Sequence, residues 1–217
     1  ISRQWDFFCS PFYYFQYVEG LRPDVVLIEQ ELLRRSWYYP QLQRQYPWLI
    51  RASQREVSEF LSELEKFEKG KRYNPVTIQK RYIAMIDSFI AKNIGSRPVY
   101  LTPEVEPSIG AGYVKVPEGL AYRLYQDDRF HSFPRPEFHY RGLHDRSYDD
   151  YFHQTVITFY SRMWASRAVY LFQHGRYAEA LEAYREALWI DPDNQQARRE
   201  LKRCETLLEP EGEPQTP

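Results

Sequence analysis

From about residue 151 onward the chain carries a helical pattern, and this pattern constrains the fold more than any other feature. Apolar side chains recur at three- and four-residue intervals over residues 151–174, again from Tyr177 to Leu188, and over residues 194–208. Gly175 separates the first two helices, and Asp191-Pro192 closes the second, because glycine ends a helix readily and proline cannot continue one. The pattern predicts a helical hairpin followed by a third, capping helix.

Within this hairpin, residues 161–194 resemble one unit of the tetratricopeptide repeat (TPR) family, whose period is 34 residues. Alanines at the helix crossing allow close approach, and large aromatic side chains fill the space around them. The matching positions are Trp164, Ala168, Leu171, Gly175, Tyr177, Ala180, Tyr184, Ala187 and Pro192. Arg167 departs from the pattern, since the repeat usually carries leucine there. One repeat cannot bury its faces alone, so we expect it to pack on the rest of the chain, capping the fold in preference to capturing a peptide.

The overall composition excludes several classes of protein. The chain has 217 residues, with 29 basic against 30 acidic side chains, and lacks the basic block that binding to nucleic acid requires. It contains no run of 18 apolar residues that could cross a membrane. Because the first residue is Ile1, we expect a fragment or an excised domain of a longer protein.

The aromatic residues, the cysteines and the histidines each bear on the kind of site the chain can form. Aromatic residues make up 17% of the chain, which favours aromatic packing over a surface that contacts sugars or peptides. Cys9 and Cys204 lie at opposite ends of the sequence, so we expect free thiols and not a disulfide. His131, His139 and His144 share one loop, but their spacing matches no metal site. We therefore expect neither a metal nor a cofactor.

The amino-terminal part alternates predicted strands and helices. Short apolar runs predict strands at residues 25–28, 99–101, 113–116 and 120–125. Helices are predicted at residues 12–19, at 53–70 with a capping box of Ser53 and Glu56, and at 74–93 with Asn74-Pro75 at the start. This alternation predicts an α/β fold in which a small, mostly parallel sheet with a mixed edge is flanked by helices.

These patterns divide the chain into four predicted segments. Residues 1–126 are predicted to form a Rossmann-like α/β domain, and residues 127–150 an irregular, solvated connector. Residues 151–208 form the TPR-like helical domain, with the hairpin and its capping helix. Residues 209–217 have the Glu, Pro and Gly content of a disordered tail.

Residues 1–126 also resemble a family of polytopic bacterial membrane proteins related to protein O-mannosyltransferases, of the GT-C glycosyltransferase class. The resemblance rests on four stretches: Trp5-Asp6-Phe7-Phe8, the run from Tyr14 to Val25, the run from Leu32 to Tyr38, and the run from Arg97 to Thr102. Many members carry a Gly-Asp-Asn-Asp type turn where this chain has Trp5-Asp6-Phe7-Phe8, and only Asp6 matches. The resemblance implies an extracytoplasmic, periplasmic domain, tethered by an amino-terminal transmembrane region that this chain lacks.

That resemblance places the catalytic acid in the missing membrane region, so the isolated domain is not expected to transfer sugar. It implies an accessory domain that holds an acceptor polypeptide or glycan, or docks a partner. The alternatives are a stand-alone TPR module for protein–protein interaction and a small α/β enzyme. No phosphate loop, nucleophile elbow or zincin motif supports an independent enzyme.

Candidate ligand-binding residues follow from the predicted sheet, because ligands of open parallel sheets bind beyond the carboxyl ends of the strands. Aspartate and arginine hydrogen-bond sugar hydroxyls or carboxylates, and tryptophan supplies a flat apolar face. The candidates are Trp5, Asp6, Glu29, Glu31, Arg34, Arg35 and Trp37. The alternative is that Asp6 caps its turn and that the arginines form surface ion pairs.

Overall fold

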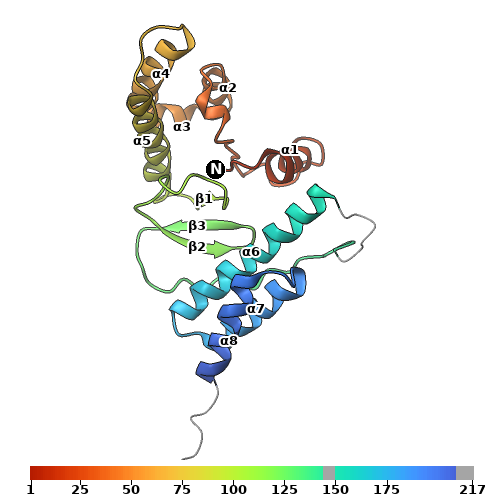
Figure 1. The fold of residues 1–217 in the computed structure, drawn as a ribbon. Coiled ribbons are helices and arrows are strands. Elements are labelled where there is room, and N and C mark those ends of the chain that lie inside the picture. The colour runs from red at the N-terminus through yellow and green to blue at the C-terminus, as the bar shows by residue number, and fades with distance from the viewer. Residues whose placement is uncertain (144–149, 209–217) are drawn as a thin grey trace, which may run out of the picture. The chain divides into compact units, whose positions relative to one another are not determined.

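The computed structural model describes residues 1–143 and 150–208 and divides into two compact units (Figure 1). One unit comprises Ile1–Lys115 and Arg123–Asp128, and the other Val116–Tyr122 and Arg129–Pro217. The predicted tail at 209–217 and residues 144–149 of the predicted connector lie outside the described residues. Each unit has its own hydrophobic core.

The first unit is mostly helical. Its helices are the π-helix η1 (Trp5–Cys9), α1 (Ser10–Tyr17), the 3-10 helix η2 (Leu32–Arg34), α2 (Tyr38–Gln45), α3 (Pro47–Ala52), α4 (Gln54–Glu68) and α5 (Pro75–Asn93). Helix α5 begins as predicted, because the Asn74 side chain accepts hydrogen bonds from the backbone N–H groups of Val76 and Thr77. Its apolar face, with Tyr82 and Met85 at the centre, is fully buried against the other helices.

The predicted capping box of α4 is wrong. Ser53 precedes the helix, but its side chain makes no capping bond and instead accepts a hydrogen bond from the Ser88 hydroxyl of α5 at 2.9 Å. Glu56 pairs with the neighbouring Arg55. Ser53 is buried at the contact of the two helices, so tertiary packing has replaced the local cap.

The sheet is small and antiparallel, which corrects the prediction of a mostly parallel one. Strands β1 (Tyr100–Leu101), β2 (Val114–Glu118) and β3 (Ala121–Tyr125) lie in the order β1-β3-β2. The two residues between β2 and β3 include Gly119 at φ +62°, and a loop that short joins only antiparallel strands. Residues 25–28 form no strand, although Ser2 and Glu29 make an isolated parallel bridge.

The second unit contains the predicted helical hairpin and capping helix, now α6 (Tyr151–Gln173), α7 (Tyr177–Ile190) and α8 (Gln195–Leu208). Gly175 has φ +73°, which is the left-handed conformation that often ends a helix. Glycine adopts this conformation with little strain because it has no Cβ atom. Ala168, Ala180 and Ala187 are completely buried between the helices. The fold of this part is confirmed, including the role of small residues at the crossing.

Both cysteines are free and buried. Burial raises the pKa of the Cys9 and Cys204 thiols above the ordinary value. A buried thiol with a raised pKa is poorly nucleophilic, so each acts as a small apolar side chain in its core.

Candidate functional site

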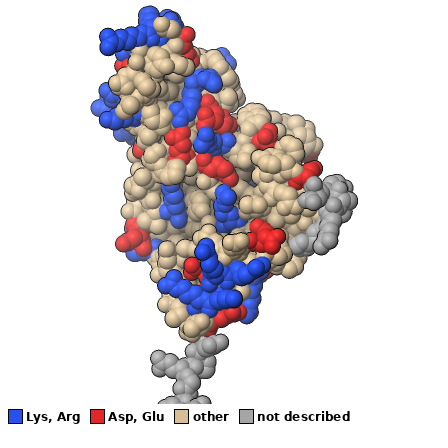
Figure 2. Space-filling model, in the orientation of Figure 1, with Lys and Arg blue, Asp and Glu red and all other residues tan. Residues whose placement is uncertain are grey.

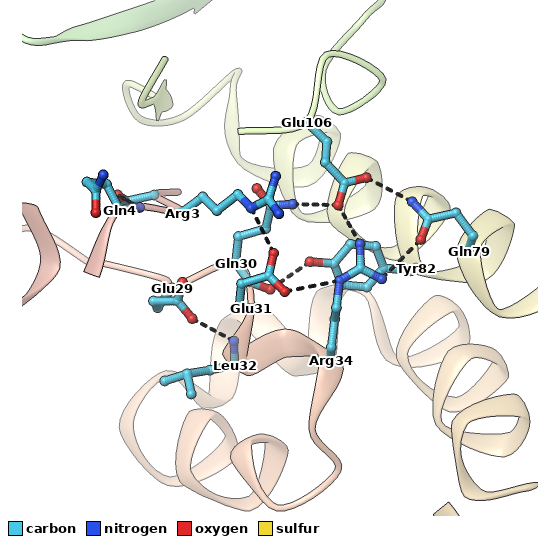
Figure 3. A network of polar contacts seen from close by, with 11 residues as sticks. Arg3, Gln4, Glu29, Gln30, Glu31, Leu32, Arg34, Gln79, Tyr82 and Glu106 are labelled. Atoms are coloured by element: carbon cyan, nitrogen blue, oxygen red, sulfur yellow. Dashed lines mark hydrogen bonds and ion pairs between the residues drawn. The ribbon is translucent and has the colours of Figure 1, made fainter. Parts of the chain in front are cut away.

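Two of the predicted site residues, Glu31 and Arg34, meet in a polar network of the first unit (Figure 3). Glu31 pairs with Arg3 at 2.9 Å and with Arg34 at 3.5 Å. Arg34 also forms an ion pair with Glu106 and donates a hydrogen bond to the Gln79 amide oxygen at 3.0 Å. The Gln79 amide in turn donates to Glu106 at 2.8 Å. One set of charged and amide groups thus joins four segments of the chain: the amino-terminal segment, the region of η2, α5 and the loop after β1.

The same network continues into the core. Gln30 is completely buried, and its amide donates to Glu106 at 3.0 Å. The Tyr82 hydroxyl donates to the Gln30 backbone carbonyl at 2.6 Å, and the Arg34 guanidinium lies 3.9 Å from the centre of the Tyr82 ring. Arg34 therefore contacts Glu31, Gln79, Tyr82 and Glu106 of its own chain, although 28% of its side chain remains exposed. This arrangement indicates a structural role for Arg34, since a ligand that bound its guanidinium would have to displace these partners.

Glu29 points away from this network in Figure 3 and has a different role. Its carboxylate accepts a hydrogen bond from the backbone N–H of Leu32 at 2.6 Å, at the start of η2. Burial is the main cause that raises the pKa of Glu29 above its ordinary value of 4.5. The folded protein consequently resists ionisation of this group, and its negative charge costs stability near neutral pH.

This raised pKa gives a prediction with a defined sign. When folding raises the pKa of a carboxyl group, ionisation of that group costs more in the folded protein than in the unfolded chain. The folded protein therefore loses stability as the pH rises from about 4.5 through the raised pKa. Glu29→Gln keeps the oxygen that accepts from Leu32 and removes the charge. We expect the variant to equal or exceed the parent in urea midpoint at pH 7.5, with this advantage lost at pH 4. Glu65→Gln is the control of opposite sign, because Lys69 lowers the pKa of Glu65. A Glu29→Gln variant less stable than the parent at pH 7.5 contradicts the prediction.

The other candidates from the sequence do not join the network. Trp5, Asp6, Arg35 and Trp37 are exposed, on η1 and on the turn before α2. The rule that grouped them concerns parallel sheets, so it no longer supports a shared site. Ligand binding by these residues stays a prediction.

Sequence reasoning missed a second set of contacts, which covers the face of the TPR-like hairpin. Residues 129–140, here called the aromatic segment, have no helix or strand structure and lie along α6 and α7. The Phe138 ring packs edge-on against Tyr160 at 5.0 Å, and the Tyr140 hydroxyl accepts a hydrogen bond from the indole N–H of Trp164 at 2.9 Å. A pattern of four aromatic residues within eleven positions was the only signal in the sequence.

Beside this segment the surface is hollowed. The hollow has a volume of about 550 Å³. Its lining residues are Arg135, Tyr140, Glu182, Arg185, Glu186 and Trp189. The Trp189 side chain is 51% exposed, with its ring 5.5 Å from that of Tyr140. On the face shown in Figure 2, Lys and Arg gather over the region of α7 and α8, with acidic side chains among them. The hollow thus combines two aromatic rings with charges of both signs.

Three histidines of the sequence, His131, His139 and His144, share one predicted loop. Among the residues that the structure describes, no group of three or more His, Cys, Asp or Glu side chains could hold a metal ion. The backbone N–H of His131 donates to the Tyr170 hydroxyl at 2.7 Å, which places this histidine in the aromatic segment. His144 lies outside the described residues.

The hairpin geometry and its buried alanines define a tetratricopeptide repeat, and the comparison with known families agrees: Tetratricopeptide repeat matches residues 161–194. Repeats of this class generally mediate protein–protein interaction. Among curated proteins, Protein O-mannosyl-transferase TMEM260 of Mus musculus is 50% identical over 34 residues. That stretch is 16% of this chain and only 5% of the mouse protein. No solved structure matches the chain.

Proposed function

We propose that this chain is a non-catalytic, polypeptide-binding accessory domain of a larger protein that resembles protein O-mannosyltransferases. The observation that carries the proposal is the tetratricopeptide hairpin with its exposed hollow beside α7. The short match to the mouse protein O-mannosyl-transferase supports a parent protein that resembles this class. In this proposal the domain lies on the extracytoplasmic side of a membrane and positions an acceptor or partner polypeptide.

The chemistry of the hollow suits a polypeptide better than a small charged ligand. Trp189 and Tyr140 offer apolar faces, while the Arg185 and Glu182 side chains, more than half exposed, offer charges of opposite sign. Exposed aromatic and arginine side chains are the residues that contribute most at protein interfaces. The polar network around Arg34, by contrast, is filled by its own partners.

Binding can be tested without knowing the natural partner. A display library of random 12-residue peptides is selected on the immobilised chain, and the affinities of enriched peptides are measured by fluorescence anisotropy. We expect Trp189→Ala to weaken binding at least tenfold, since truncating an aromatic anchor costs about 2 kcal/mol. The matched control is Trp37→Ala, a tryptophan of the first unit that is 60% exposed, compared with 51% for Trp189. Loss of binding on Trp37→Ala alone assigns the site to the first unit and overturns the proposal.

The parent protein can be tested separately. Among the described residues, no helix combines the length and the apolar composition that crossing a membrane requires. The transmembrane tether is part of the proposal and is tested on the native protein. An antibody raised against the chain is used to follow the native protein through detergent partition and electrophoresis. A large band that requires detergent supports the accessory-domain proposal.

The alternative is a stand-alone tetratricopeptide module for protein–protein interaction, which the family match at residues 161–194 favours on its own. In that case the antibody detects a detergent-independent band near 26.3 kDa. Such a band overturns the membrane-bound parent and leaves the polypeptide-binding hollow as the function.

A further inference from the structure

The aromatic segment (residues 129–140) contacts α6 along one stripe of the helix, ring by ring. The Phe130 ring stacks on Tyr170 with centres 5.7 Å apart, and Phe138 packs on Tyr160 near the other end. The contacted residues of α6 recur every three or four positions, so they form one face. As the segment proceeds from Phe130 to Phe138 its contacts move toward the amino end of α6, and it therefore runs antiparallel to that helix.

Its main chain is recognised as well as its side chains. The Arg167 guanidinium donates hydrogen bonds to the backbone carbonyls of Pro134 at 3.1 Å and Phe133 at 3.3 Å. The same group lies 4.1 Å from the centre of the Phe133 ring. Arg167 is only 9% exposed, and it stands at the position where the repeat usually carries leucine. The residue that departs from the repeat pattern, Arg167, is thus the one that hydrogen-bonds the backbone of the segment.

A charged contact fixes the middle of the segment. Arg135 forms ion pairs with Glu186 and, at 3.5 Å, with Glu182, which are four residues apart on α7. Its guanidinium also lies 5.7 Å from the centre of the Trp164 ring. The face therefore contacts three features of the segment: aromatic rings, the backbone carbonyls of Phe133 and Pro134, and the Arg135 side chain.

We propose that the aromatic segment is a ligand bound in cis, and that the face it covers recognises an extended partner peptide of the same chemistry. That chemistry is two phenylalanines three residues apart followed by proline and arginine, as in Phe130, Phe133, Pro134 and Arg135. The proposal rests on the polypeptide-binding function and names its partner and regulation. Arg135 and Tyr140 also line the hollow, so a partner that enters the hollow touches the segment it must displace.

Because the aromatic segment is covalently joined to the face that it covers, it can block that face against a free peptide. A segment joined to its own binding face competes at an effective concentration in the millimolar range, so a free peptide reaches the face only when the cis contacts open. The apparent dissociation constant rises by the inverse of the open fraction. Weakening the cis contacts should therefore tighten binding in trans, which a merely structural cover of the hairpin would not do.

The test uses a fluorescein-labelled peptide with the sequence of residues 129–141 and the full chain. We expect Phe130→Ala/Phe133→Ala in the chain to bind the peptide at least tenfold tighter than the parent does. Adding Arg167→Ala should reverse this gain, and a peptide with alanine at both phenylalanine positions should not bind. Arg135→Glu is the second variant, because this partly exposed side chain is not needed to fill the core. This substitution should also release the aromatic segment from the face, because the introduced carboxylate is repelled by Glu182 and Glu186.

Circular dichroism and the thermal midpoint establish which variants are folded. A folded Phe130→Ala/Phe133→Ala or Arg135→Glu chain that binds the peptide no better than the parent overturns the inference. The segment is then a structural cover that replaces a neighbouring repeat. If library peptides still bind the parent through Trp189, only the cis-ligand inference fails. If neither kind of peptide binds, the polypeptide-binding function fails with it.

Discussion

Glu106→Ala is expected to destabilise the first unit by about 2–3 kcal/mol, although Glu106 lies in a loop. Its carboxylate accepts hydrogen bonds from Gln30, Arg34 and Gln79, and Gln30 is fully buried. Removing the carboxylate takes away the acceptor of the buried Gln30 amide, and it takes one partner each from Arg34 and Gln79. Because the Arg34 and Glu106 side chains are 28% and 21% exposed, we place the cost below that of a fully buried pair.

The measurement is hydrogen exchange of the α5 amides together with urea denaturation, since α5 carries Gln79 and Tyr82. Glu106→Gln should cost about half as much, because it keeps one acceptor oxygen and loses the charge. The matched control is Glu59→Ala, which removes the exposed ion pair with Arg81 and should change stability by less than about 0.5 kcal/mol. Equal losses for Glu59→Ala and Glu106→Ala would show that the network is an ordinary surface cluster.

The sequence allowed α5 and the hairpin of α6 and α7 to be predicted well, for reasons that are local, whereas α2 and α3 were not predicted. Asn74-Pro75 marks the start of α5, and the three- and four-residue spacing of Tyr82 and Met85 marks its buried face. Gly175 marks the turn between α6 and α7. Each of these signals lies within a few residues of the structure it specifies, so no long-range information was needed.

The sheet could not be predicted in the same way. Residues 25–28 are an apolar run of the length of a strand, but such a run is equally compatible with burial without strand pairing. The short loop at Gly119 forces an antiparallel hairpin, and this local signal was outweighed by the alternation of strands and helices. The mistake lay in the direction of pairing, which depends on which distant segments meet.

The candidate sites show the same division. Glu31 and Arg34 are three residues apart and were recognised together, but their partners Gln79 and Glu106 come from 45 and 72 residues beyond Arg34. The hydrogen bonds from Arg167 to residues 133 and 134 span 34 and 33 positions, respectively, and no periodic pattern in the sequence indicates them. An arginine at a leucine position was the visible sign, and its meaning needed the structure.

Tyr184→Ala is expected to cost about 3–5 kcal/mol and to unfold much of the second unit, because truncation of a buried aromatic residue removes its contacts and leaves a cavity. Tyr184 is 1% exposed and packs with the buried alanines of α6 and α7. Repeat arrays share such losses among neighbouring units, but this match covers one repeat. The loss is therefore comparable to the total stability of a small domain.

The measurement is thermal and urea unfolding followed by circular dichroism, with hydrogen exchange of α6 and α7 to locate the loss. Tyr184→Phe keeps the ring and should change stability by less than about 1.5 kcal/mol. Trp189→Ala, on the same helix but half exposed, should leave the hairpin folded while it weakens peptide binding. The substitutions Tyr184→Ala and Trp189→Ala thus distinguish the two faces of α7. Tyr184 stabilises the core of the repeat, and Trp189 contributes to its binding surface. Unfolding by Trp189→Ala, or tolerance of Tyr184→Ala, would contradict that division.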